Sequence, residues 1–145
     1  SLSCDMIVAS NETVFGLPEV KRSLVAAAGG LFRLPRALGM ATAMELITTG
    51  DPLPAQRAYE LGMVNKVVDK ADVLDEAKAL ASRIMANAPL AVQASRNVAS
   101  KAMIDDDSDL WRAGNKAFQG IVGTEDYKEG PLAFIEKRPP NWKGK

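Results

Sequence analysis

Glu19 is the residue of this sequence whose type and setting best suit proton transfer; it lies in VFGLPEVKRSLVAAAGGLFRLPRALG (residues 14–39). Because Leu17, Pro18 and Val20 are apolar, we expect the Glu19 carboxylate to be partly desolvated, which suits an acid or base working at neutral pH. Pro18 also fits the first turn of a helix, where a glutamate commonly does no more than interact with the helix dipole. Residue types alone favour the helix-dipole role.

The composition excludes several other kinds of site. The chain has 145 residues and no histidine, so it contains no Ser-His-Asp or Cys-His nucleophile system and no histidine-containing zinc site. Its 18 Lys+Arg against 18 Asp+Glu leave no net charge to attract nucleic acid or a membrane. No apolar run reaches the roughly 18 residues of a membrane helix, and residues 1–10 lack the basic stretch of a signal peptide. With Cys4 as its single cysteine the chain can form no intrachain disulfide, which is compatible with a reducing compartment. We expect a cytoplasmic protein.

The elements that would position Glu19 fall in residues 1–68 and predict an α/β fold. Strands are expected at Cys4–Ala9, Val14–Gly16 and Met63–Val68, and helices at about Ala37–Thr49 and Ala55–Leu61. The first of these strands comes unusually close to residue 1, because most domains begin with loosely held polar residues. We therefore expect the chain to begin within a fold.

Residues 69–145 are expected to contain helices and no strand. Apolar residues recur at helical spacing from Val73 to Ile84, and further helices are expected at about Leu90–Met103, Ser108–Val122 and Thr124–Glu136. Helices strung out in this way cannot form a compact core alone, so they should pack on the first half or on another subunit. The sequence thus predicts two regions, 1–68 and 69–145.

Three other segments invite a functional interpretation. AAAGG (residues 26–30) places small-residue backbone at an expected helix start, where a ligand could receive N–H bonds, but a tight packing turn explains it equally well. DDDSD (residues 105–109) is better explained by helix capping than by calcium, because Lys116 stands where an EF-hand needs its glutamate. Near the other end, Phe134 and the basic residues from Lys137 onward could hold a small anion or interact only with a helix dipole.

Four blocks of the sequence together resemble one family. They are FGLPEVKRSLVAAAGGLFRLPRALG (15–39), AMELITTGDPLPAQRAYELGMVNKVV (43–68), NAPLAVQASRNV (87–98) and EGPLAFIEKRPPNWKGK (129–145). In order and spacing they closely resemble the crotonase family, also called the enoyl-CoA hydratase/isomerase superfamily. SLSCDMIVA (1–9) is similar to a strand near the middle of complete members, so the chain is expected to correspond to their C-terminal half.

The resemblance implies a fold and a reaction. The family fold is a spiral of β-β-α turns (here residues 1–68) followed by a helical trimerisation region that helps to cover CoA (here residues 69–145). Members hold the thioester carbonyl of an acyl-CoA in an oxyanion hole of two backbone N–H groups. The implied activity is that of an enoyl-CoA hydratase, which adds water across the 2,3 double bond in fatty-acid or related acyl-CoA metabolism. The implied state is a homotrimer or dimer of trimers that needs no cofactor beyond the CoA of its substrate and binds neither nucleic acid nor membrane.

The resemblance also assigns roles to single residues. Glu19 matches the second catalytic glutamate of the hydratases, which gives a proton to the α-carbon or removes it. Gly16 and Leu17 are expected to contact the substrate, and Ala27 matches a backbone position beside the catalytic water. Phe134 and Lys137 match residues that reach the CoA adenine region, commonly from a neighbouring subunit.

Some parts of the family pattern have no counterpart in these 145 residues. The first catalytic glutamate and both oxyanion-hole residues are missing, and VAAAGG (25–30) replaces the more usual Pro-Gly-Ala-Gly-Gly. Hydration normally uses two carboxylates, whereas double-bond isomerisation needs only one. Two alternatives therefore stay open: another crotonase activity, isomerase or hydrolase, and a non-catalytic fragment. The chain alone is expected neither to fold stably nor to hydrate an enoyl-CoA.

Overall fold

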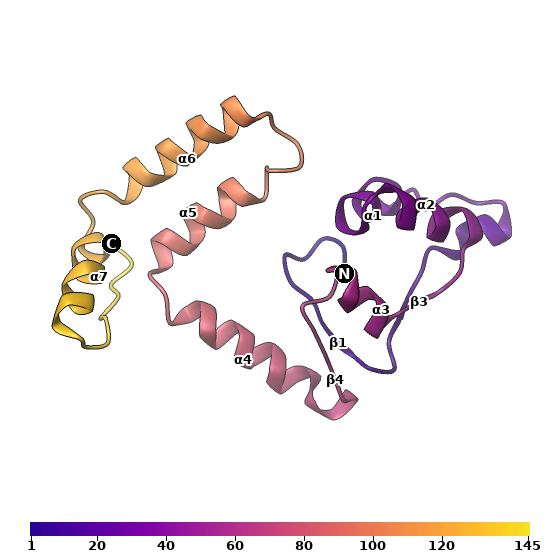
Figure 1. Cartoon of the computed structure of the whole chain (residues 1–145), viewed down its shortest axis with the longest axis horizontal. Coiled ribbons are helices and arrows are strands. Elements are labelled where there is room, and N and C mark those ends of the chain that lie inside the picture. Colours follow the sequence, from indigo (N-terminus) through magenta and orange to yellow (C-terminus); the bar gives the residue numbers. More distant parts are fainter. The chain divides into compact units, whose positions relative to one another are not determined.

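The structure, a computed structural model, describes all residues from Ser1 to Lys145 and contains both helices and strands (Figure 1). The chain forms two compact units, Ser1–Ala79 and Leu80–Lys145. Every strand lies in the first unit, and the last one ends at Val68. This confirms the predicted α/β class and the absence of strands from residue 69 onward. The functional division at that residue stays a prediction.

The four strands form two short pairs. β1 (Val8–Ser10) lies parallel to β4 (Lys66–Val68), and β2 (Val14–Phe15) lies antiparallel to β3 (Leu53–Pro54). The strand predicted at Cys4–Ala9 begins only at Val8. The Cys4 amide donates to the Ser1 carbonyl at 2.9 Å and closes a turn there, and the Ile7 amide donates to the Asn65 side chain at 2.8 Å instead of to a strand backbone. The pairing of β2 with β3 fixes the segment that leads directly into Glu19.

The helices of the first unit are the 3-10 helix η1 (Pro18–Arg22), α1 (Gly30–Leu38), α2 (Met40–Thr49) and α3 (Ala55–Glu60). The last of these confirms the helix predicted at Ala55–Leu61. The helix predicted at Ala37–Thr49 is divided, because Gly39 between α1 and α2 has a φ of 77° and interrupts the helical backbone. Most of α1 was not predicted, since Pro35, which has no N–H to donate, lies inside it.

The hydrophobic core of the first unit is made mostly of small and medium-sized side chains. Its buried members are Ala9, Leu34, Ala43, Leu46, Leu53, Ala55, Ala58, Met63 and Val64. They come from β1, α1, α2, β3, α3 and the loop after α3. Leu17 and Phe15 pack against this cluster, so the core holds both ends of the short segment before Glu19.

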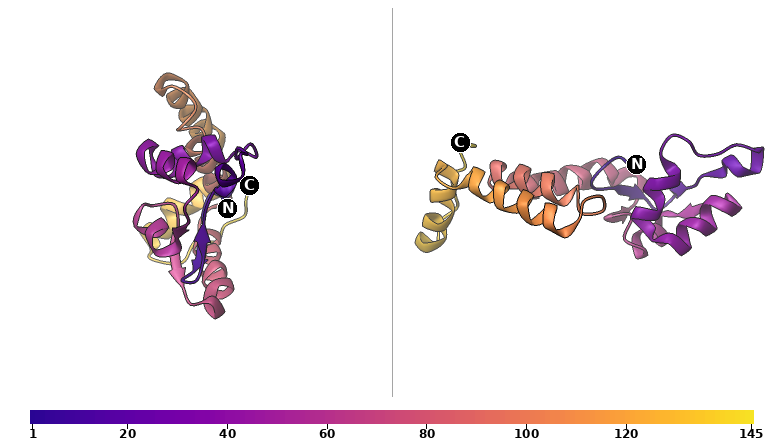
Figure 2. Two further views of the ribbon diagram at one scale, coloured as in Figure 1. Left: turned by 90° about the vertical axis from the view of Figure 1, so that its right-hand side faces the viewer. Right: turned by 90° about the horizontal axis from the view of Figure 1, so that it is seen from above.

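The helices that follow are η2 (Lys70–Asp72), α4 (Val73–Met85), α5 (Pro89–Ala99), α6 (Asp107–Ile121) and α7 (Glu125–Glu136). α5 and α6 pack side by side (Figure 2). The Asp109 amide donates to the Asp106 side chain at 3.0 Å, which confirms the capping interpretation of the acidic segment. Only Asp126 and Ala133 are buried from residue 80 onward, so these helices leave most of their apolar side chains at the surface.

Two further observations concern the whole chain. None of its helices combines the length and the apolar character that crossing a membrane requires. No three side chains of His, Cys, Asp or Glu are grouped so that they could hold a metal ion.

Candidate active site

Glu19 occupies the second position of η1, the short helix that follows β2. Pro18 takes the first position, and Ser23 ends the helix in a left-handed conformation with a φ of 56°. Inside this turn the Leu24 amide donates to the Glu19 carbonyl at 3.1 Å. Pro18 therefore does begin a helix, as its type predicts, and the tight turn holds the Glu19 backbone from both sides.

The Glu19 carboxylate has an unusual environment. Its Oε2 atom is buried and has no hydrogen-bond partner, and it is the only buried side-chain oxygen or nitrogen in this condition. Burying a polar oxygen without a partner is unfavourable, so almost all such atoms in folded proteins are paired. A buried polar atom that lacks a hydrogen-bond partner and lies on the wall of a cavity indicates that its partner comes from outside the chain.

A cavity of about 210 Å³ adjoins Glu19. Its walls come from η1, from the turn before α1, from the first turn of α1 and from the first residues of the chain. They are Ser1, Leu2, Ser3, Leu17, Glu19, Ala26, Ala28, Gly29, Gly30 and Arg33. The segments FGLPE and AAAGG, singled out separately in the sequence, thus meet at one cavity.

The glycines of AAAGG allow this close approach. Gly29, the N-cap residue immediately before α1, has a φ of 96°, a conformation that L side chains rarely adopt. A Cβ atom at Gly30 would lie 2.9 Å from Leu17 Cδ2 and 3.2 Å from Ala26 Cβ. The two interpretations of AAAGG are therefore compatible: the segment is a packing turn, and its backbone also forms one wall of the cavity.

Arg33 is a member of this cavity that the sequence did not single out. Its guanidinium lies 5.3 Å from the Phe32 ring centre, and its Nη1 atom donates to the Ala28 carbonyl at 3.5 Å. Together with the amide end of α1, it places positive charge beside the Glu19 cavity. Arg33 stands one helical turn after Gly29 and so faces the same side as the start of α1, but this spacing is informative only once residues 30–38 are known to be helical.

Ala27 behaves differently from its neighbours. Ala26 and Ala28 line the cavity, whereas Ala27 does not and is exposed. The Ala27 amide donates to the Val25 carbonyl at 2.8 Å, so its N–H is used within the turn. The predicted place of the Ala27 backbone beside a catalytic water stays a prediction.

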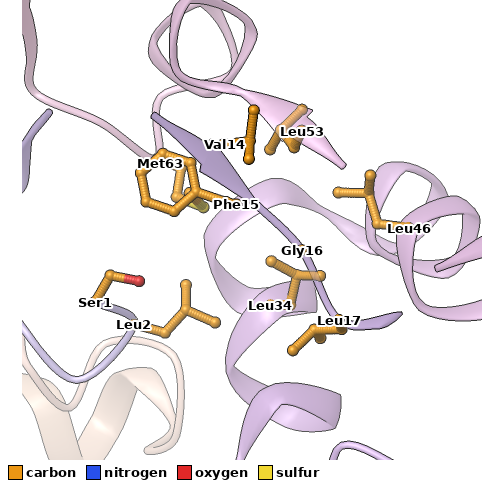
Figure 3. A pocket seen from close by; sticks show the side chains of 10 residues that line it. All are labelled: Ser1, Leu2, Val14, Phe15, Gly16, Leu17, Leu34, Leu46, Leu53 and Met63. Atoms are coloured by element: carbon orange, nitrogen blue, oxygen red, sulfur yellow. The ribbon is translucent and has the colours of Figure 1, made fainter. Parts of the chain in front are cut away.

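A second, apolar pocket of about 290 Å³ shares Ser1, Leu2 and Leu17 with the Glu19 cavity. Figure 3 shows its lining, which comprises Ser1, Leu2, Val14, Phe15, Gly16, Leu17, Leu34, Leu46, Leu53 and Met63. Gly16 and Leu17, both predicted to contact substrate, lie in its wall. A carboxylate cavity that adjoins an apolar pocket suits a molecule with a reactive polar group and a hydrocarbon chain.

The other two predicted binding residues, Phe134 and Lys137, belong to the second unit. Phe134, on α7, has 86% of its surface exposed, and Lys137 ends that helix in a left-handed conformation with a φ of 53°. The Lys137 amide donates to the Phe134 carbonyl at 3.3 Å, so one tight turn holds both residues. Their contribution to the same substrate site as Glu19 stays a prediction.

The family model described as enoyl-CoA hydratase/isomerase matches residues 1–145. The chain belongs to this family. A carnitinyl-CoA dehydratase of Proteus mirabilis is 40% identical over 149 residues, which cover all of this chain and 57% of that protein. The carnitinyl-CoA dehydratase of Escherichia coli K12 is 38% identical with the same coverage. The chain therefore spans 57% of the length of the curated relatives it matches.

Solved structures of the crotonase family match the fold closely. The crystal structure of an enoyl-CoA hydratase from Mycobacterium tuberculosis H37Rv gives a TM-score of 0.94 at 45% identity, over 99% of this chain and 57% of that one. The enoyl-CoA hydratase from Bacillus anthracis gives 0.96 at 36% identity, over 100% of this chain and 56% of that one. The crotonase-like fold is thus confirmed. That the matched part is the C-terminal half stays a prediction.

Proposed function

We propose that this chain is part of a longer enoyl-CoA hydratase, the full-length protein. In this enzyme Glu19 gives a proton to the α-carbon of the acyl-CoA or removes it. The observation that carries the proposal is the buried, unpartnered Glu19 Oε2 at a cavity that adjoins an apolar pocket. Membership of the enoyl-CoA hydratase/isomerase family supports it.

In the proposed reaction, the oxygen of water bonds to the β-carbon of the enoyl thioester, and the double-bond electrons move to form an enolate. Protonated Glu19 then gives its proton to the α-carbon, which restores the thioester carbonyl. In the reverse direction the Glu19 carboxylate removes the α-proton, and the β-hydroxyl leaves as water. A second carboxylate, which takes the proton from the attacking water, and the oxyanion donors would come from outside these 145 residues.

The Glu19 cavity and the apolar pocket beside it suit the two parts of an enoyl-CoA, its reacting carbon atoms and its acyl chain. The apolar pocket would hold the acyl chain, and Leu17, which lines both the pocket and the cavity, would separate that chain from the carboxylate. Positive charge from Arg33 and the start of α1 lies on the Glu19 side, where the carboxylate becomes negative as its proton passes to the α-carbon.

The remaining parts of the proposal concern CoA and assembly. Phe134 and Lys137 would contact the adenine nucleotide of CoA, from a neighbouring subunit of a homotrimer or a dimer of trimers. The exposed apolar side chains of the second unit support such an assembly, because they would otherwise face water. We further infer a cytoplasmic enzyme that needs no cofactor beyond the substrate's own CoA and has no nucleic-acid or membrane partner.

Two related reactions would use the same site. Dehydration of a 3-hydroxyacyl-CoA is the reverse of hydration, and the names of the carnitinyl-CoA dehydratases favour it. Double-bond isomerisation is favoured by the single carboxylate at the cavity, since one base can remove a proton from one carbon and return it to another.

The substitution Glu19→Gln in the full-length protein tests the central step. Loss of the enoyl thioester absorbance of crotonyl-CoA should slow by about a hundredfold or more, because the α-carbon loses its proton donor. Exchange of the α-protons of butyryl-CoA with heavy water should slow similarly. Because this exchange involves no attack by water, it shows whether Glu19 acts at the α-carbon or activates the water. Glu45→Gln, at an exposed glutamate on α2, is the matched control and should change neither rate. Hydration that stays within tenfold of the parent would remove Glu19 from the chemistry.

A further inference from the structure

The end of α7 is closed by an uncommon backbone conformation at Lys137. Lys137 has φ 53° and ψ 39°, and its amide donates to the Phe134 carbonyl at 3.3 Å. The next amide, of Arg138, donates to the Ala133 carbonyl at 3.1 Å. Glycine is the usual residue at the left-handed position of this capping motif, because a Cβ atom crowds the backbone there. A lysine in its place must be held by the structure around it.

The residue after Lys137 supplies that support. The Arg138 guanidinium binds Glu129 through two hydrogen bonds, from Nη1 to Oε1 at 2.6 Å and from Nη2 to Oε2 at 2.9 Å. Its Nε atom donates to Glu136 Oε2 at 2.6 Å. Because Glu136 and Arg138 flank Lys137, the bond between them closes the chain reversal around the lysine. We call Arg138, Glu129 and Glu136 the Arg138 clamp.

The same contacts leave Lys137 without an acidic partner. Both carboxylates nearest to it in the sequence on α7, Glu129 and Glu136, are bound to Arg138, and Glu129 also accepts the Asn141 amide at 2.7 Å. No ion pair joins Lys137 to any carboxylate, and its side chain is exposed. The Lys137 ammonium is therefore free to meet an anion from outside the chain.

The other two acids of α7 are also engaged elsewhere. Asp126, which is 4% exposed, accepts the Lys143 amide at 2.6 Å and the Gly144 amide at 2.9 Å. Glu125 lies 3.7 Å from the ammonium of Lys145. Each carboxylate of α7 thus has a partner that is not Lys137.

We propose that the Arg138 clamp is a positioning device for Lys137. It holds the lysine in its reversed conformation, and it keeps Glu129 and Glu136 from neutralising the lysine ammonium. Lys137 then offers an unpaired positive charge, three residues after the exposed Phe134, to the phosphate-bearing nucleotide of CoA. This inference rests on the proposed function for the identity of that anion. Arg138, Glu129 and Glu136 do not themselves contact the substrate.

The substitution Arg138→Gln in the full-length protein tests the clamp. It loosens the turn and frees two carboxylates near Lys137. Hydration is measured with crotonyl-CoA and with crotonyl-pantetheine, which has the same acyl group but no nucleotide. KM for crotonyl-CoA should rise by about fivefold with kcat nearly unchanged, and kcat/KM for crotonyl-pantetheine should stay within about twofold of the parent. Arg138→Lys, which keeps the charge but not the two-pronged geometry, should give an intermediate KM.

Two further variants show how much KM changes when a single lysine charge is removed. Lys145→Gln removes the same charge from an exposed ion pair with Glu125, in the first turn of α7, and should change KM for neither thioester. Lys137→Gln should raise KM for crotonyl-CoA at least as much as Arg138→Gln does. Binding of adenosine 3′,5′-bisphosphate, followed by titration calorimetry, measures the same step without turnover, and Arg138→Gln should weaken it by about fivefold.

The results of these experiments distinguish a failure of the Arg138 clamp from a failure of the proposed hydratase function. Equal losses with both thioesters would show that Arg138 acts only on stability, and would overturn the inference. An effect of Lys137→Gln without one of Arg138→Gln would overturn it too, while leaving the proposed function intact. If the parent binds the bisphosphate through Lys137 and Arg138→Gln weakens this binding, the clamp stands even where no hydration is found.

Discussion

Gly30 and Leu17 are packed so closely that a Cβ atom at residue 30 would lie 2.9 Å from Leu17 Cδ2. Leu17 immediately precedes η1, and Glu19 follows two residues later. The start of α1 and the candidate catalytic carboxylate are therefore coupled through one side chain.

Gly30→Ala is expected to disturb both the fold and the site. The added methyl group forces Leu17 to move, which should cost about 1–3 kcal/mol of unfolding free energy. The displaced Leu17 shifts Glu19, so kcat/KM for an enoyl-CoA should fall by about tenfold or more. Denaturant unfolding and steady-state hydration of the full-length protein measure the two effects.

Gly114→Ala is the matched control for Gly30→Ala. Gly114 lies within α6, and a Cβ atom there would meet nothing within 4 Å. The change should leave activity unaltered and stabilise the helix by about 0.5–1 kcal/mol. A Gly30→Ala protein as stable and active as the parent would show that Leu17 does not couple the two elements.

The pair between Glu129 and Arg138 should make stability depend on pH at the acidic end. Hydrogen bonds from the Arg138 guanidinium, and then from the Asn141 amide, lower the pKa of Glu129 from 4.5 to about 2. A carboxyl group whose pKa is lower in the folded state stabilises the fold above its unfolded pKa. That contribution disappears as the pH falls from 4.5 through about 2.

The measurement is the melting temperature of the parent and of Glu129→Gln as a function of pH. The parent should melt higher at neutral pH, and the two curves should converge between pH 4.5 and about 2. Glu125→Gln, which affects the looser pair with Lys145 at 3.7 Å, should differ little from the parent throughout. A constant difference between the parent and Glu129→Gln across this range would contradict the pairing.

Asp126 should be essential for the ordered path of the last residues. Its two carboxylate oxygens accept the amides of Lys143 and Gly144, and the residue is almost fully buried. Asp126→Asn turns an NH₂ group toward one of these amide donors, which should cost about 1–3 kcal/mol. Limited proteolysis should then cut residues 139–145 sooner than in the parent.

The control for Asp126→Asn is Asp107→Asn, at an exposed position in the first turn of α6. It removes one carboxylate charge near a helix start and should cost no more than about 1 kcal/mol. If Asp126→Asn destabilises no more than this control, the two amide bonds do not hold the tail.

The sequence predicted those features that depend on local pattern. Helical spacing located α4 to α7, and the acidic segment DDDSD (105–109) indicated a helix cap, which the structure assigns to Asp106. The resemblance of FGLPE and AAAGG placed Glu19 beside a small-residue turn, and the structure brings the two together. None of this required knowledge of distant contacts.

The features that were missed depend on tertiary packing. Arg33 joins the Glu19 cavity only because α1 is helical despite Pro35, which pattern alone argues against. The Ala27 amide is used by the turn itself, which no residue type reveals. The Arg138 clamp joins residues nine apart, and its two-pronged geometry is set by the chain reversal at Lys137.

The break between α1 and α2 gives a prediction that separates conformational strain from crowding. Gly39 has a φ of 77°, yet a Cβ atom there would meet nothing within 4 Å. With a ψ of 160° this backbone conformation lies outside the left-handed helical region and is nearly confined to glycine. Gly39→Ala should therefore cost only that backbone strain, about 1–3 kcal/mol, and should not move Leu17 or Glu19. The full-length variant should unfold at lower denaturant concentration but hydrate an enoyl-CoA at the parent rate. A loss of activity as large as that of Gly30→Ala would mean instead that the angle between α1 and α2 itself sets the position of Glu19.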